Sequence, residues 1–201
     1  MPSARSDLRY AARALRRNPG LTVAVDPLDR AASKIVLRVQ GSILQINSSA
    51  GGLPKRSMPA GFISTLGLEG DGHAHPTIHG GPRKAVLLIA SEIVDGLAAR
   101  GYPVFYGAMG ENLTTRGIDI GALRIGDRLR AGAAVLEITQ PRGPCTALDV
   151  YGPSIKDEIY DLRVSQLDAT SIRWGMSGLY ASVIQPGDVQ PGDAIELLPM
   201  L

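Results

Sequence analysis

The sequence contains a single cysteine, Cys145, at the end of the stretch QPRGPC. Arg142 lies three residues before it, and a neighbouring cation favours the thiolate, which is the form of cysteine that binds metals. Pro141 and Pro144 fix two backbone φ angles and bias the residues before them toward extended geometry. This stiff frame indicates a thiol held in place for chemistry. An inert, buried cysteine is the alternative that the stretch alone leaves open.

A second stretch, GLEGDGHAHPTIHGGPRKA, brings together all three histidines of the chain, His73, His75 and His79, with Asp71. Imidazole and carboxylate ligands suit zinc or iron, so H-x-H-x₃-H beside an aspartate is a pattern for a metal site. The alternative is a polar loop whose histidines cap backbone groups or lie in water.

The same stretch ends in residues that suit an anion. Gly80 and Gly81 allow the backbone to approach a ligand closely, and Arg83 and Lys84 add two positive charges. With a body of low net charge, these residues indicate a local site for a small anion.

A third polar stretch, GAMGENLTTRGIDIG, offers Glu111 and Asn112 in a turn, followed by Thr114 and Thr115. These residues either line a pocket or only hold its turn, because an asparagine in a turn commonly bonds to its own backbone. The shorter stretch IGDRL (125–129) is typical of a turn that leads into a strand.

The elements that must position these residues are mostly short strands. Alternation and β-branched residues predict a strand over 34–46, or a hairpin bent near Gly41, and further strands over 84–90 and 133–140. A helix is expected over 91–101, with Ser91 as N-cap and Gly101 as stop, and a short one after Ser154. Two Pro-Gly-Asp turns frame a last strand near the C-terminal end. This pattern predicts a mainly β, β-rich α+β fold, a barrel or sandwich with a few short helices.

Composition and charge narrow the class of protein. At 201 residues and 44% hydrophobic residues, one domain is expected over 31–201, preceded by a basic amphipathic extension over 1–30. Residues 1–20 carry a net charge of +4 and the remainder −2, which disfavours nucleic-acid binding. No apolar run approaches the roughly 18 residues of a membrane span, and one cysteine forbids an internal disulfide. A cytoplasmic protein is therefore expected.

The order of several motifs resembles one known family. GLEGD, HGGPRKAV, GENLTTRGI, IGDRL, QPRGPC and GLYASVIQPGDVQPGDAIEL follow one another between about residues 34 and 198. This order resembles the MOSC domain, named for the C-terminal domain of molybdenum-cofactor sulfurases, and in particular its stand-alone bacterial members. The resemblance implies a distorted closed β-barrel with a few helices.

The resemblance also implies a chemistry. Active members of the family carry a pyranopterin molybdenum cofactor and reduce N-hydroxylated compounds, such as hydroxylamines, hydroxylaminopurines and amidoximes, to amines. The family's metal-binding cysteine falls on Cys145, and a soft thiolate suits such a metal. Glu111 or a histidine would donate a proton. The residues that would hold the cofactor are Arg142, Arg83, Lys84, His79, Asn112 and Thr114.

The electrons must come from elsewhere, because the sequence has no cysteine cluster for iron–sulfur and no flavin or nicotinamide fingerprint. A separate reductase is therefore an expected partner, beside the small N-hydroxylated substrate. No pyridoxal-phosphate cofactor is expected either, and the oligomeric state is open. Three alternatives remain: a carrier of sulfur or molybdenum cofactor on Cys145, a metalloenzyme built on His73, His75 and His79, and a non-catalytic binding barrel.

Overall fold

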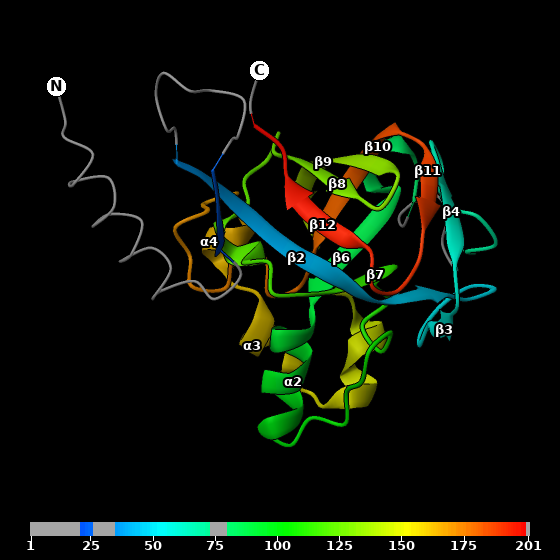
Figure 1. The fold of residues 1–201 in the computed structure, drawn as a ribbon. Coiled ribbons are helices and arrows are strands. Elements are labelled where there is room, and N and C mark those ends of the chain that lie inside the picture. Colours follow the sequence, from blue (N-terminus) through cyan, green and yellow to red (C-terminus); the bar gives the residue numbers. More distant parts are fainter. Residues whose placement is uncertain (1–20, 26–34, 73–79, 200–201) are drawn as a thin grey trace, which may run out of the picture.

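The structure is a computed structural model that describes residues 21–25, 35–72 and 80–199 (Figure 1). No helix among these residues is long and apolar enough to cross a membrane. The strands are β1 (Leu21–Val25), β2 (Ile35–Ser48), β3 (Arg56–Met58), β4 (Gly61–Ser64), β5 (Gly67–Leu68), β6 (Val86–Ala90), β7 (Leu113–Arg116), β8 (Arg128–Ala131), β9 (Ala134–Pro141), β10 (Leu179–Gln185), β11 (Gly187–Val189) and β12 (Ala194–Leu197). The helices are α2 (Ser91–Ala99), α3 (Ile155–Ile159) and α4 (Leu162–Ser165), with short 3₁₀ helices η1 (Pro82–Lys84), η2 (Ile120–Ala122) and η3 (Thr146–Tyr151).

Seven strands close into a mixed β-barrel in the order β2-β12-β8-β9-β10-β6-β7, and β7 pairs back onto β2 (Figure 1). The β6–β7 pair is parallel, and the other six pairs of this barrel are antiparallel. Strands β1 and β3 add to β2, while β11, β4 and β5 form a small separate sheet. The expected mainly β fold with a closed barrel and a few short helices is confirmed.

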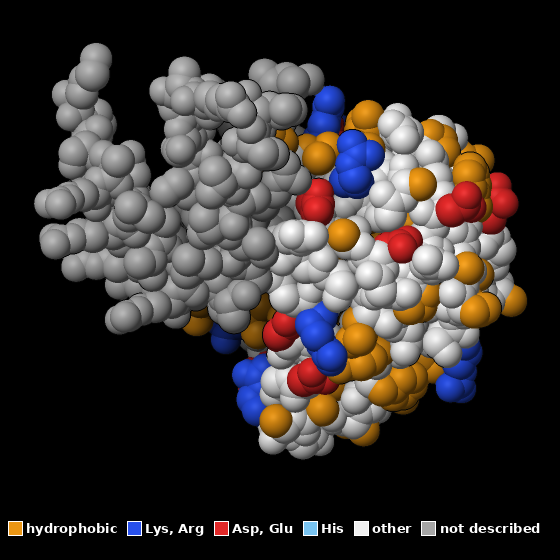
Figure 2. Space-filling model, in the orientation of Figure 1, with side chains coloured by type: hydrophobic (Ala, Val, Ile, Leu, Met, Phe, Trp, Pro, Cys, Tyr) orange, Lys and Arg blue, Asp and Glu red, His pale blue; other side chains and the backbone are white. Residues whose placement is uncertain are grey.

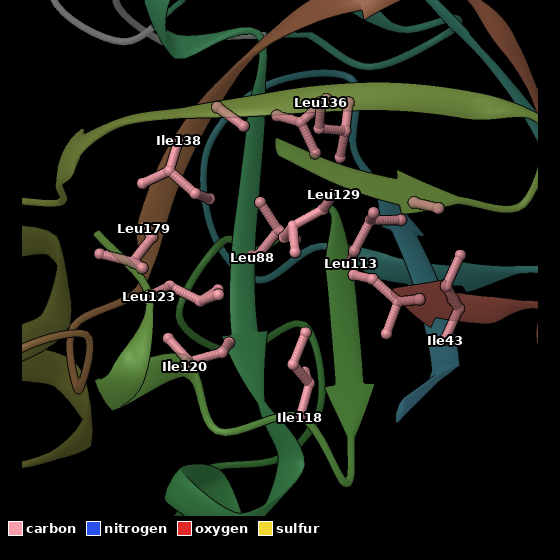
Figure 3. Close-up of a cluster of buried hydrophobic side chains, with 14 of the residues drawn as sticks. Ile43, Leu88, Leu113, Ile118, Ile120, Leu123, Leu129, Leu136, Ile138 and Leu179 are labelled. Atoms are coloured by element: carbon pink, nitrogen blue, oxygen red, sulfur yellow. The ribbon is translucent and has the colours of Figure 1, made fainter. Parts of the chain in front are cut away.

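The barrel is filled with aliphatic side chains that face one another across its interior (Figure 3). On β6, Val86 and Leu88 belong to this core, whereas Ile89 belongs to a second apolar cluster outside the barrel. Successive side chains of a strand point to opposite faces, so β6 supplies both clusters. The second cluster packs α2, η3 and α3 against the outer wall, and these elements lie together on one side of the barrel in Figure 1.

Most predicted elements match the structure, with three differences. Strand β2 runs continuously through Gly41, where a Cβ atom would come within 2.3 Å of the Arg116 carbonyl oxygen, so the glycine permits close strand pairing. Helix α2 takes Ala90 as its N-cap, and Ser91 is its first helical residue. Strand β1 falls inside the 1–30 segment expected to be an extension, and it pairs with β2. The rest of the basic amphipathic extension expected over 1–30 lies outside the described residues.

Charged side chains on the described part of the face drawn in Figure 2 form small separate groups of both signs. That mixture agrees with the low net charge of the chain outside residues 1–20.

Candidate functional site

A pocket lies on the outer wall of the barrel, and Cys145 is at its edge. Together with its open mouth it holds about 750 Å³ of empty space. Six separate parts of the chain line it: the segment after β2, Gly72, the stretch from Gly80 through η1 into β6, the Met109–Asn112 turn, the QPRGPC loop with the start of η3, and β10. The lining residues are Gly52, Leu53, Lys55, Gly72, Gly80, Lys84, Leu87, Met109, Gly110, Asn112, Arg142, Cys145, Ala147 and Tyr180.

Cys145 is the N-cap residue of η3, and it is partly exposed in the pocket. Its backbone is extended, and its carbonyl oxygen accepts a hydrogen bond from Leu148 N at 3.2 Å. Because Leu148 is fully buried in the outer apolar cluster, η3 is anchored directly behind the thiol. The sulfur is therefore presented to the pocket from a fixed backbone.

Arg142 is buried beside this thiol and is held by its backbone. Its N–H donates to the Gly178 carbonyl at 2.9 Å, and its carbonyl accepts from the Ser177 hydroxyl at 2.5 Å. The Arg142 Nη1 atom has no hydrogen-bond partner among the described residues. A buried guanidinium donor without a partner is costly, so the pocket is suited to an anionic group that would accept from it.

A buried network of three side chains forms another wall of the pocket. Lys55 Nζ lies 2.5 Å from Asp71 Oδ2, and both side chains are less than 10% exposed, at 7% and 3%. The same Asp71 oxygen accepts from Asn112 Nδ2 at 2.8 Å, and its Oδ1 accepts from Ser49 N at 3.0 Å. Burial lowers the pKa of Lys55, and the Asp71 carboxylate opposes that shift. The carboxylate thus fixes a lysine and an amide side by side.

Asn112 is also tied to the barrel strand beneath the pocket. Its Oδ1 accepts from Leu87 N at 3.1 Å, and its own N–H donates to the Leu87 carbonyl at 2.9 Å. Asn112 directly precedes β7, and these two bonds continue the pairing of β7 with β6 by one residue. The expectation of a turn asparagine that only bonds its own backbone does not describe this geometry.

Glu111 and Thr114 lie behind the pocket lining. Glu111 is fully buried, and its Oε1 accepts from Gly107 N at 2.6 Å and from the Thr114 hydroxyl at 3.1 Å. Thr114 accepts in turn from Asn47 Nδ2 at 3.1 Å. Burial raises the pKa of Glu111, and its Oε2 has no partner among the described residues. This pair braces the turn that carries Asn112.

Lys84 and Tyr180 form the remaining polar wall. The Lys84 ammonium lies 5.8 Å from the centre of the Tyr180 ring, within range of a cation–π interaction. Burial raises the pKa of the Tyr180 phenol, Arg142 opposes this shift, and Cys145 adds to it. Tyr180 therefore belongs electrostatically to the same site as the thiol and the guanidinium.

The structure brings together four of the residues singled out in the sequence: Cys145, Arg142, Lys84 and Asn112. Glu111 and Thr114 lie behind the lining, and Arg83 is exposed and lines a neighbouring hollow instead. His79, like His73 and His75, lies outside the described residues. Within the described ranges no three histidine, cysteine, aspartate or glutamate side chains gather as a metal site.

Two polar residues of the pocket, Lys55 and Tyr180, could not be identified from the sequence. Lys55 lies in the stretch GGLPKRSM, which contains no chemical signature beyond its two glycines and one proline. Tyr180 sits in a strand whose alternation predicts only one buried and one outward face. Asp71 was grouped with the histidines as a metal ligand, but its carboxylate is taken up by Lys55, Asn112 and Ser49. The signal that links these residues is spatial.

The pocket residues fit an anionic ligand that carries a soft metal, because a thiolate is a good ligand for such metals. A partly exposed thiol lies beside a buried guanidinium with an unpartnered donor, and Lys84 adds a second positive charge. The Asp71 carboxylate, which contacts this lining, is paired with Lys55, so this pair adds no net charge to the pocket. The fold and the site together define a small closed β-barrel with a cationic, thiol-bearing pocket on its outer wall.

Comparison with known proteins gives this class a family. The family model of the MOSC domain matches residues 75–196, and the chain belongs to this family, which is associated with the molybdenum cofactor. Protein YiiM of Escherichia coli (strain K12) is 32% identical over 145 residues, 68% of this chain and 58% of that protein. The uncharacterized protein YflK of Bacillus subtilis (strain 168) is 37% identical over 135 residues, 65% of this chain and 55% of that protein. The chain thus spans little more than half the length of these relatives.

Solved structures agree with the family. The crystal structure of YiiM from Geobacillus stearothermophilus has a TM-score of 0.61 at 26% identity, over 79% of this chain and 75% of that one. The crystal structure of YiiM from Escherichia coli has a TM-score of 0.56 at 26% identity, over 80% and 71%. The barrel described above is therefore the fold of the family's stand-alone members.

Proposed function

We propose that this protein binds a pyranopterin molybdenum cofactor through Cys145 and reduces N-hydroxylated compounds to amines. Hydroxylamines, hydroxylaminopurines and amidoximes are the substrate class, and a separate reductase supplies the electrons. The observation that carries the proposal is the partly exposed Cys145 at a pocket also lined by Arg142 and Lys84, in a chain of the MOSC family. The net reaction breaks one N–O bond, consumes two electrons and two protons, and releases water together with the amine, or with the amidine when the substrate is an amidoxime.

Each pocket residue has a role in this proposal. The Cys145 thiolate ligates the metal, and the unpartnered Nη1 of Arg142 donates to an anionic oxygen of the cofactor. Lys84 and Asn112, which also line the pocket, hold the same group. When bound, the molybdenum centre supplies the two-electron chemistry that side chains lack.

Proton delivery is assigned to the groups that line the pocket. Glu111, a candidate from the sequence, lies behind the lining, while Lys55 and Tyr180 face the pocket. Because burial lowers the pKa of Lys55, its ammonium gives up a proton more readily than an exposed lysine does.

A free thiol as metal ligand suits a reducing compartment, so we propose the cytoplasm as the location.

Metal analysis tests this function. The protein is produced in a host that makes the cofactor, and molybdenum per chain is measured by plasma mass spectrometry together with benzamidoxime reduction by a chemical reductant. We expect about one molybdenum per chain and turnover, both lost in Cys145→Ser, because a hydroxyl is a poor ligand for a soft metal. Val150→Ala, an exposed change on the same 3₁₀ helix, is the matched control and should keep both.

The possible outcomes separate the alternatives. Full molybdenum and activity in Cys145→Ser would refute the ligand assignment. Molybdenum bound through Cys145 without turnover would instead favour a carrier of the cofactor. One equivalent of zinc or iron that is lost in His73→Ala/His75→Ala would favour the histidine site.

A further inference from the structure

A second hollow adjoins the pocket on the outer wall and shares two lining residues with it. Together with its open mouth it holds about 880 Å³ of empty space. Residues from η1, from the end of β9, from β10 and from the segment around α4 line it. The argument uses six of them: Arg83, Lys84, Gly143, Tyr160, Leu167 and Tyr180.

The two hollows share a wall. Lys84 and Tyr180 line both of them, with the ammonium 5.8 Å from the ring centre. A molecule in the second hollow would therefore contact the same two side chains as a group in the first. The geometry is that of two adjoining compartments divided by one pair of residues.

The second hollow also touches the loop that carries the thiol. Gly143 lies two residues before Cys145 and lines this hollow. A Cβ atom at Gly143 would meet the Tyr160 hydroxyl oxygen at 3.9 Å and no closer atom, so the Tyr160 side chain reaches across to this loop. A molecule bound against Tyr160 therefore lies next to the QPRGPC segment.

The cation at the rim is placed by a rigid backbone. The Thr139 hydroxyl lies 2.5 Å from the Arg83 carbonyl oxygen and 3.1 Å from the Tyr180 carbonyl oxygen, where it can donate to either. Pro82 at the start of η1 fixes the preceding turn. Arg83 thus projects from a segment that is pinned to β9 and β10, although its side chain is exposed.

The lining defines the ligand chemistry. Arg83 and Lys84 contribute two positive charges, and no aspartate or glutamate is among the described residues that line this hollow. Tyr160 and Tyr180 contribute aromatic rings, and the exposed Leu167 adds an apolar rim. Guanidinium groups bind carboxylates and phosphates in a bidentate manner, and aromatic rings favour flat partners.

We propose that this second hollow binds the part of the substrate remote from its N–OH group, and that it selects flat aromatic substrates with a carboxylate or phosphate. This inference rests on the proposed reductase function, because it assigns the substrate end of the same site. Arg83 pairs with the anionic group of the substrate, while Tyr160 and Tyr180 hold the ring between that group and Cys145.

A pair of matched ligands tests the inference. Benzamidoxime and 4-carboxybenzamidoxime are compared as substrates, and their amidine products, benzamidine and 4-amidinobenzoate, are compared as ligands by titration calorimetry on the isolated protein. We expect the carboxylated member to be preferred about tenfold in kcat/KM and in affinity, in line with one charge-assisted hydrogen bond. Arg83→Gln should abolish the preference. Arg130→Gln, an exposed arginine on β8 that lines neither hollow, should retain it.

The two levels of the proposal fail differently. Turnover of both amidoximes with equal kcat/KM, and equal affinity for both amidines, would overturn the second hollow and leave the reductase function intact. Loss of the preference in Arg130→Gln as well as Arg83→Gln would also overturn it, because the effect would then be one of net charge. Absence of turnover, with an Arg83-dependent preference for 4-amidinobenzoate, would overturn the reductase function and support the hollow as an anion-selective aromatic site.

Discussion

The interior of the barrel and the pocket on its outer wall use the same strands for opposite purposes. On β6, Leu88 faces an interior that is filled with aliphatic side chains, while its neighbour Leu87 lines the pocket (Figure 3). On β10, Leu179 points inward and Tyr180 outward in the same way. The alternation of a strand thus connects a dry core directly to a polar site one residue away.

The two regions differ in how completely their groups are satisfied. The interior gains free energy from apolar burial and contains no charges in its core cluster. The pocket region buries Lys55, Asp71, Glu111 and Arg142, which is expensive unless each charge finds partners. The Lys55–Asp71–Asn112 network is complete, whereas Arg142 and Glu111 each keep an unpartnered atom among the described residues. The core therefore supplies stability, and the pocket region lowers it by burying polar atoms that lack partners among the described residues.

The largest expected effect comes from breaking the completed network. Asp71→Ala leaves the Lys55 ammonium buried without its counter-ion, which costs about 3–5 kcal/mol of unfolding free energy. Urea unfolding monitored by Trp174 fluorescence measures it. Replacing the lysine as well, in Lys55→Met/Asp71→Ala, should recover part of that loss, because the uncompensated charge is removed.

A matched control distinguishes pairing from loss of charge in general. Asp188 is exposed on β11, and Asp188→Ala should change the unfolding free energy by less than about 0.5 kcal/mol. If Asp71→Ala proved as mild as Asp188→Ala, the buried ion pair would not be a stabilising feature of the pocket.

The interior should respond with stability alone. Leu136 is fully buried in the barrel, and Leu136→Ala should cost about 2–5 kcal/mol through lost apolar burial and a cavity. Molybdenum per folded chain, measured below the unfolding transition, should stay at the wild-type value because Leu136 does not line the pocket. A proportional fall in molybdenum would show that the barrel interior and the pocket are coupled, contrary to this prediction.

The same contrast explains what the sequence could predict. The strands over 84–90 and 133–140 could be predicted from an apolar run and from alternation, because the pattern of buried side chains along each strand is visible in the sequence. The presented thiol follows from the prolines around Cys145, and the ordered motifs identify the family. These features are local in the chain or carried by the order of the motifs.

The other pocket residues depend on contacts between distant segments. Lys55 meets Asp71 across 16 residues, and Asp71 meets Asn112 across 41. Sequence periodicity does not predict contacts between segments so far apart in the chain. Glu111 and Thr114 show the converse case: their polar stretch left open whether they line a pocket or hold its turn, and the turn folds them behind the lining, where they bond to each other. Burial of a polar side chain is set by tertiary packing, so residue type alone could not distinguish lining from support.

The last prediction concerns the unfolding free energy of Glu111→Gln. Its difference from the wild type should be close to zero at acidic pH and should grow as the pH rises. Burial raises the pKa of the Glu111 carboxyl above the usual 4.5, so its contribution to stability is full below about pH 4.5 and is lost as the pH rises through the folded-state value. Glutamine cannot ionise and keeps an acceptor for Gly107 N–H. Glu111→Gln should therefore match the wild type near pH 4 and gain on it at higher pH, by no more than about 1.4 kcal/mol per pH unit. Urea unfolding of both proteins from pH 4 to 8 measures this difference, in which the other titrating groups largely cancel. A gap that closed as the pH rose would mean that Arg142 and Lys55 hold Glu111 as a stabilising carboxylate, and that the pocket wall, like the Lys55–Asp71 pair, is already complete without a ligand.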